Sequence, residues 1–187
     1  TVTDDNGNTI TYQYDNMNRV IKVTDALSGV TTYTYNNAGD LLSSTNALGY
    51  TVSYTYDAYG NKLTETDARG NTTTYTYDAN GNLLTVKDAL NNVTAYTYNS
   101  RNLLVNVTNA KNQTVTYGYD ALGRQISVTD AKNNTIYTAY DGAGNVLTVT
   151  DAKGNVISTT TYNELNQIET VTDSSGNTLS YEYNKIE

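Results

Sequence analysis

A Tyr-Asp or Tyr-Asn dipeptide returns every 21 residues along most of this 187-residue chain, and this period constrains the fold more than any other feature. The copies begin at Tyr14, Tyr35, Tyr56, Tyr77, Tyr98, Tyr119, Tyr140, Tyr162 and Tyr183. The step from Tyr140 to Tyr162 is 22 residues long, and its extra residue falls within Val156 to Tyr162. We predict a single array of about nine repeats over residues 1–187, with a one-residue β-bulge at the longer step.

Each repeat contains two turn signals that begin at Asp or Asn. In one of them Gly, Asn or Ser follows three residues later, as in Asp67 with Gly70, and the other comes directly after the tyrosine, as in Asp78 with Gly81. A leading Asp or Asn accepts hydrogen bonds from backbone N–H groups just ahead of it, and Gly and Asn tolerate positive φ. These signals predict hairpin turns of type I followed by a left-handed residue.

Between the turns, apolar and polar residues alternate with the period of two that is typical of strands. Tyr75 and Tyr77 share one face of such a strand, whereas Thr74 and Thr76 share the other, and Leu, Val and Ile recur on one face of the following strand. The predicted fold class is all-β, with about seventeen antiparallel strands in tandem hairpins. Because no second layer is encoded, we expect a curled or spiralling sheet, an arc or part of a hollow β-shell, with the Tyr, Leu and Val face inward and shielded from water.

Composition excludes several classes of chemistry. The chain has 19 Tyr but no Phe, Trp, His, Cys or Pro, so the usual general base, thiolate nucleophiles and the commonest transition-metal ligand are absent. We therefore expect no enzyme, with no catalytic, cofactor-binding or metal-binding residues. A net charge of −8 with scattered basic residues argues against nucleic acid as a partner. No apolar run reaches the length of a membrane span.

Acidic residues invite two further hypotheses, which turn chemistry explains better. Nearly every Asp opens a turn, and the run Asp4-Asp5-Asn6-Gly7-Asn8 lacks the spacing of a calcium loop. Glu65 and Glu169 occupy strand positions that are otherwise apolar, for which edge effects or the bulge near Val156 to Tyr162 are the favoured cause. Hydrolysis by paired carboxylates stays open as a third reading, and it predicts turnover on polysaccharides.

The repeats resemble a known family. Gly49–Leu63 (GYTVSYTYDAYGNKL) and Gly70–Leu84 (GNTTTYTYDANGNLL) are similar to the motif G-x(3–9)-YxYDxxGxL of the YD-repeat, or Rhs-repeat, proteins. This resemblance covers essentially the whole chain and extends to bacterial Rhs and wall-associated toxins, the B and C components of insecticidal toxin complexes, and teneurins. It implies long antiparallel sheets that spiral into a hollow shell, which in the toxins sequesters a C-terminal effector domain.

The chain departs from complete toxin shells in one region. Those shells resemble each other in an Asp-Pro-x-Gly-Leu segment whose Asp residues perform self-cleavage, and a chain without Pro lacks it. The chain also starts within a repeat and stops at Tyr183-Asn184-Lys-Ile-Glu without a capping segment. We expect a fragment of a larger protein, or a tract that self-associates at its edge strands.

The resemblance implies a structural module that forms part of a β-shell wall and encapsulates or presents a C-terminal toxin or effector domain of a secreted or cell-surface bacterial protein. The expected partners are the remainder of the shell and the enclosed effector, with self-association and glycans as further candidates. The alternative is a carbohydrate- or protein-binding, adhesin-like stalk, since carbohydrate binding is associated with the family. Tyr50 and Tyr59 break the repeat pattern at turns, and they are the candidate ligand-binding residues.

Overall fold

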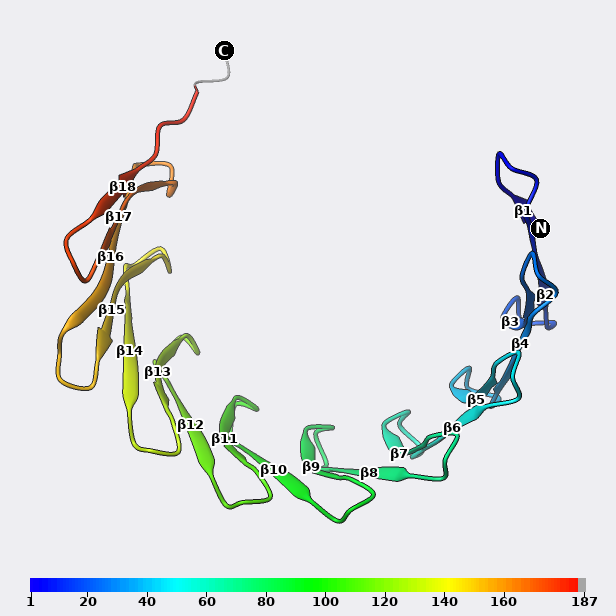
Figure 1. Ribbon diagram of the computed structural model, residues 1–187. Coiled ribbons are helices and arrows are strands. Elements are labelled where there is room, and N and C mark those ends of the chain that lie inside the picture. The colour runs from blue at the N-terminus through cyan, green and yellow to red at the C-terminus, as the bar shows by residue number, and fades with distance from the viewer. Residues whose placement is uncertain (185–187) are drawn as a thin grey trace. The chain divides into compact units, whose positions relative to one another are not determined.

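The computed structural model describes residues 1–184, which form strands and turns and contain no helix. The chain divides into two compact units, Thr1–Thr94 and the residues from Ala95 onward, and each is described by itself. Both units consist of successive hairpins, which confirms the all-β class that the period-two alternation predicts (Figure 1).

Strands follow one another in chain order within each unit. The first unit contains β1 (Val2–Thr3), β2 (Thr9–Tyr14), β3 (Val20–Thr24), β4 (Val30–Tyr35), β5 (Leu41–Thr45), β6 (Thr51–Tyr56), β7 (Lys62–Thr66), β8 (Thr72–Tyr77) and β9 (Leu83–Lys87). The boundary falls within β10 (Val93–Tyr98), after which come β11 (Leu104–Thr108), β12 (Thr114–Tyr119), β13 (Gln125–Thr129), β14 (Thr135–Tyr140), β15 (Val146–Asp151), β16 (Val156–Tyr162), β17 (Ile168–Asp173) and β18 (Thr178–Ser180). From β1 to β9, and again from β10 to β18, each strand pairs antiparallel with the next.

The turn between β6 and β7 illustrates how each hairpin closes. The Asp57 backbone N–H donates to the Asn61 carbonyl at 3.0 Å, and the Gly60 N–H donates to the Asp57 carbonyl at 3.3 Å. Gly60 has a φ of +87°, and the equivalent residue Asn102 has a φ of +59°. Type I turns followed by a left-handed residue are therefore confirmed, and they explain why Gly or Asn stands at this position.

In most repeats the second tyrosine ties one hairpin to the preceding one. The Tyr119 hydroxyl of β12 donates to the Leu104 carbonyl oxygen of β11 at 2.8 Å. The same bond is made by Tyr35, Tyr56, Tyr77, Tyr140, Tyr162 and Tyr183. A phenol is required here because only a hydroxyl at the end of an aromatic ring both covers the neighbouring strand and donates to its carbonyl.

A β-bulge recurs in the strand that follows each tyrosine strand. Tyr75 pairs with Val86 and Tyr77 with Leu83, so Leu84 is the additional residue. This regular bulge does not follow from the spacing of the repeats. It places two consecutive residues, such as Leu83 and Leu84, opposite one tyrosine.

The separate bulge predicted within Val156 to Tyr162 is confirmed. Val149 pairs with Ser158 and Thr150 with Val156, which leaves Ile157 without an opposite residue. The 22-residue step is therefore absorbed inside one strand, and the turns on either side keep their form.

Each unit is a single layer of sheet with two different faces. One face, named here the tyrosine face, carries the paired tyrosines and the aliphatic residues opposite them, such as Tyr75 and Val86. The other face carries threonines, whose hydroxyls pair across strands, as Thr76 and Thr85 do at 2.6 Å. Across residues 1–184 no side chain is buried, and most residues of the tyrosine face are half-buried. The expected shielding of this face is thus only partial, because the described residues supply no second layer over it.

Candidate functional site

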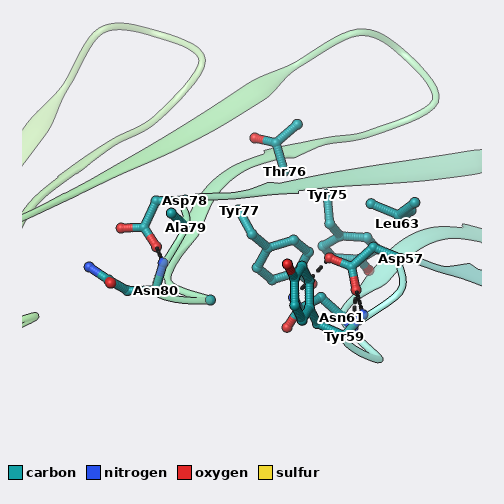
Figure 2. Close-up of a pocket in the computed structure, with 11 residues that line it drawn as sticks. Asp57, Tyr59, Asn61, Leu63, Tyr75, Thr76, Tyr77, Asp78, Ala79 and Asn80 are labelled. Atoms are coloured by element: carbon teal, nitrogen blue, oxygen red, sulfur yellow. Dashed lines mark hydrogen bonds between the residues drawn. The ribbon is translucent and has the colours of Figure 1, made fainter.

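A concavity of the first unit lies between two turns at the same edge of the sheet, 57–61 and 78–82, and we name it the turn pocket. Its volume is about 730 Å³. It is lined by Asp57, Tyr59, Asn61, Leu63, Tyr75, Thr76, Tyr77, Asp78, Ala79, Asn80 and Gly81 (Figure 2). Three tyrosines and two carboxylates therefore meet in one place, although they come from different segments.

Two of the tyrosines belong to the regular pattern of β8. Figure 2 shows Tyr75 and Tyr77 extending from the strand toward Tyr59 and Asn61 of the preceding turn. The Tyr77 hydroxyl donates to the Lys62 carbonyl oxygen at 2.9 Å, which fixes the ring. Burial raises the pKa of Tyr77 above its usual value, so the phenol stays neutral over the ordinary pH range.

Carboxylates lie at the rim of the turn pocket and are held by their own turns. Asp57 Oδ1 accepts the backbone N–H groups of Tyr59 and Asn61 at 2.8 and 2.9 Å. Its Oδ2 accepts the Asn61 side-chain amide at 2.9 Å. That side-chain hydrogen bond, followed by those from the backbone, holds the pKa of Asp57 below its usual value. The pKa of Asp78 is lowered for the same reason, with Asn82 as the side-chain donor.

An ion pair lies beside the turn pocket, at positions where most other repeats have aliphatic residues. Lys62 Nζ lies 2.6 Å from Glu65 Oε2. The same ammonium lies 4.7 Å from the centre of the Tyr75 ring and 5.6 Å from that of Tyr54. The hydrogen bond to Glu65 raises the pKa of Lys62. Glu65 is thus explained by its partner Lys62, which corrects the expectation that an edge or the bulge near Val156 to Tyr162 causes it.

Glu169 has a different explanation. Thr161 pairs with Thr170 and Tyr162 with Ile168, so Glu169 is the additional residue of the bulge in β17. Its side chain is exposed there, so a charged group at this position stays in contact with water. The bulge responsible is the regular one of its own strand, not the one at Ile157.

The two tyrosines that the sequence singles out do not share a site. Tyr59 is 91% exposed in the turn after β6 and lines the turn pocket. Tyr50 is 58% exposed and precedes β6, at the other end of the same strand. Their ligand-binding role stays a prediction. Sequence reasoning missed Tyr75, Tyr77 and Asp57 as pocket residues because each fits the repeat, and the only signal was the irregular Tyr59 beside them.

A smaller version of the pocket occurs in the second unit. It has a volume of about 560 Å³ and is lined by Asn163, Leu165, Gln167, Glu169, Tyr181, Tyr183 and Asn184. Asn163 and Leu165 stand where the turn pocket has Asp57 and Tyr59. The concavity is therefore a property of the repeat, whereas its charge and its aromatic rim vary between repeats.

Two features of other kinds of site are absent from residues 1–184. Within that range no three His, Cys, Asp or Glu side chains are grouped as a metal site would require. The structure there also contains no helix of sufficient length and apolar character to cross a membrane.

The described residues form tandem hairpins that are closed by Asx-type turns and joined by tyrosine hydroxyls, an architecture that fits the class of YD-repeat shell proteins. The family model for the Teneurin YD-shell matches residues 1–150, and the chain belongs to that family. The model for the RHS Repeat matches residues 140–178. This result agrees with the resemblance found in the repeat motif.

Solved structures with the same fold come from toxin complexes. The chain is similar to part of the crystal structure of TcdB2-TccC3-TEV, with a TM-score of 0.70 and 20% identity over 92% of this chain. It is also similar to TcdB2-TccC3-Cdc42, with a TM-score of 0.66 and 16% identity over 94% of this chain. A third is the Tc holotoxin pore of Photorhabdus luminescens with the mutation TccC3-D651A, with a TM-score of 0.65 and 17% identity over 90%.

The matched region is a small part of those proteins. The chain spans 10% of the matched chain in TcdB2-TccC3-TEV, 13% of that in TcdB2-TccC3-Cdc42 and 12% of that in the holotoxin pore. A comparison with curated proteins found no match. The similarity at these identities establishes a shared fold.

Proposed function

We propose that this chain is a structural, non-catalytic segment of a β-shell wall in a secreted or cell-surface protein, and that the wall encloses or presents a C-terminal effector domain. The observation that carries the proposal is the tyrosine face. It is half-exposed in both units, and no side chain of residues 1–184 is buried. A half-exposed and largely apolar face of this kind favours a partner that covers it.

The two faces suit an enclosing wall. Threonine hydroxyls on one face bond to each other, as at Thr55 and Thr64 with 2.6 Å between oxygens, and suit contact with water. Backbone hydrogen bonds from strand to strand leave no gap for a protease within a unit. Exclusion of water and proteases is therefore the mechanism that we propose.

We further propose that residues 1–187 are a single array within a longer polypeptide. The small share of each similar chain that it covers supports this view. Under this proposal the partners are the remainder of the shell and the effector, with edge-strand pairing as a route to self-association.

Protease protection of the attached C-terminal domain tests the wall function in the full-length protein. Thr116→Pro removes a backbone N–H from β12, a strand paired on both sides. We expect the wild type to protect the C-terminal domain and Thr116→Pro to expose it to cleavage. Ala121→Pro is the matched control, because position two of a type I turn accepts Pro. Equal cleavage of wild type and Thr116→Pro would refute the wall function.

The alternative function is a binding stalk for carbohydrates or proteins. The favouring observation is Tyr59, which is exposed and lines a pocket with Tyr75 and Tyr77. Glycan-array binding that is lost in Tyr59→Ala or Tyr50→Ala would support it. Absence of binding by the wild type would remove the carbohydrate form of this alternative.

A further inference from the structure

Two arginines that occupy the same position of the repeat, Arg19 and Arg124, fill the space between neighbouring turns at one edge of the sheet, one in each unit. Arg101 reaches the next turn from a different repeat position. Arg19 donates from Nε to Asp15 Oδ2 at 2.7 Å and from Nη1 to the Asn36 carbonyl oxygen of the next turn at 2.8 Å. Its guanidinium carbon lies 4.8 Å from the centre of the Tyr35 ring. The repeat thus provides three groups that contact a guanidinium, namely a carboxylate, the face of an aromatic ring and a turn carbonyl.

Arg124 repeats this arrangement in the second unit. Its Nε donates to Asp120 Oδ2 at 2.7 Å and its Nη1 to the Asp141 carbonyl oxygen at 2.8 Å. Its guanidinium carbon lies 4.7 Å from the centre of the Tyr140 ring. Two independent copies with nearly equal geometry indicate a site that the repeat itself builds.

The turn pocket keeps these three groups but has Asn61 where the arginines stand. Asp57 corresponds to Asp15 and Asp120, and Tyr77 corresponds to Tyr35 and Tyr140. The Tyr77 ring is held by the same hydroxyl bond as its equivalents, at 2.9 Å to the Lys62 carbonyl. The Asp78 carbonyl stands where Asn36 and Asp141 offer theirs. Because Asn61 is short, the space is open, with a volume of about 730 Å³.

Charge and shape in the turn pocket favour a planar cation. Asp57 and Asp78 supply negative charge at the rim, and the residues that line the pocket include no Lys or Arg. Tyr59 adds a third aromatic wall that the Arg19 and Arg124 sites lack, since Met17 and Leu122 stand there. The nearby Lys62 ammonium is paired with Glu65 at 2.6 Å, which limits its repulsion.

We propose that the turn pocket binds a guanidinium group, supplied either by an arginine side chain of a protein partner or by a free arginine-like molecule. The bound group stacks on the Tyr77 ring, donates to Asp57 and donates to the Asp78 carbonyl, as Arg19 and Arg124 do within the chain. Asp57 Oδ2 also accepts the Asn61 amide at 2.9 Å, so the guanidinium uses the remaining acceptor capacity of that carboxylate. This inference rests on the repeat geometry and does not require the wall function. A failure of either leaves the other standing.

Binding of N-acetyl-arginine amide to the whole chain tests this proposal, with calorimetry for affinity and amide NMR shifts for location. We expect saturable binding with shifts confined to residues 57–61 and 75–81. Affinity for the neutral isostere N-acetyl-citrulline amide should be about tenfold weaker, because the charge-assisted hydrogen bonds are lost. Equal binding of the citrulline compound would overturn the proposal.

Variants at two positions complete the test. Asn61→Arg supplies an internal guanidinium and should abolish binding, whereas Asn61→Gln, which is neutral, should retain it. Asp57→Asn should weaken binding while the turn stays folded, because Asn opens equivalent turns at Asn36 and Asn99. Binding by Asn61→Arg equal to that of the wild type contradicts the assignment. Shifts of the same amides on addition of a neutral saccharide, with no shifts on addition of N-acetyl-arginine amide, would also contradict it.

An additional comparison separates the two sources of the group. A short peptide with one central arginine is measured beside N-acetyl-arginine amide, and a lysine peptide serves as the control. Tighter binding of the arginine peptide assigns the pocket to a protein partner, and equal affinity assigns it to a free arginine-like ligand. Preference for the lysine peptide would contradict recognition of a planar guanidinium.

Discussion

At the scale of single residues, the two tyrosines and the acid of the Tyr-x-Tyr-Asp motif have different structural roles. The first tyrosine covers the sheet, the second also donates its hydroxyl to the preceding hairpin, and the acid closes the turn. Tyr117, Tyr119 and Asp120 show this division in one strand, with Tyr119 bonded to Leu104 and Asp120 to two backbone N–H groups. Repetition of the motif is therefore repetition of one set of hydrogen bonds.

Removal of a single hydroxyl tests this division. Tyr119→Phe should destabilise the protein by about 0.5–1.5 kcal/mol, the usual net contribution of one hydrogen bond. Tyr117→Phe should change stability little, since the Tyr117 hydroxyl has no hydrogen-bond partner among residues 1–184. Denaturant unfolding of both variants measures the difference, and equal losses would show that the hydroxyl bond of Tyr119 contributes nothing specific.

The turn carboxylates predict sensitivity to acid. Side-chain amides four residues ahead, together with backbone N–H groups, lower the pKa of Asp67, Asp88 and Asp130 in the folded state. A lowered folded pKa contributes stability at pH values above the unfolded pKa, and that contribution is lost as the pH falls through the folded value. Melting temperatures followed by circular dichroism should be flat from about pH 7 to 5 and fall below about pH 4.

Asparagine variants provide the control for acid sensitivity. Asn46 and Asn109 open equivalent turns with neutral amides, which accept the same two backbone N–H groups. Replacement of Asp67, Asp88 and Asp130 together by Asn should reduce the loss of melting temperature in acid. An unchanged acid profile in this triple variant would assign the sensitivity to other groups.

At the scale of strands and turns, the repeat period was a sufficient guide to most elements. Positions of the turns, their left-handed residues and the bulge within Val156 to Tyr162 all follow from spacing. The regular bulge at residues such as Leu84 does not, because consecutive apolar residues such as Leu83 and Leu84 fit a plain strand equally well. The turn pocket could not be predicted from the sequence either, because it depends on how far apart Asp57 and Tyr77 lie in space.

Deletion of the bulged residue tests the element scale. Removal of Ile157 should leave the melting temperature nearly unchanged, because Ile157 has no residue opposite it and the pairs on both sides remain. Removal of Thr138 from β14, where Thr138 pairs with Val149, should destabilise the protein strongly. A one-residue loss there moves the adjacent side chains to the wrong faces. Similar effects of both deletions would contradict the register.

At the scale of the whole chain, the sequence indicated an apolar face but not its final environment. Half-exposure of the tyrosines arises because residues 1–184 form single-layer sheets, and no property of a repeat reveals what covers such a layer. The family and the shared fold with toxin-complex structures support a wall, and they leave the enclosed partner as a proposal.

Hydroxyl-radical labelling of the full-length protein, read by mass spectrometry, tests the central claim that a partner covers the tyrosine face. Tyr54 and Tyr117 report on that face, and Tyr50 reports on an exposed turn. The account predicts that Tyr54 and Tyr117 are labelled several-fold less than Tyr50, and that unfolding the protein abolishes the difference. Labelling of Tyr54 and Tyr117 as rapid as that of Tyr50 in the native full-length protein would contradict it.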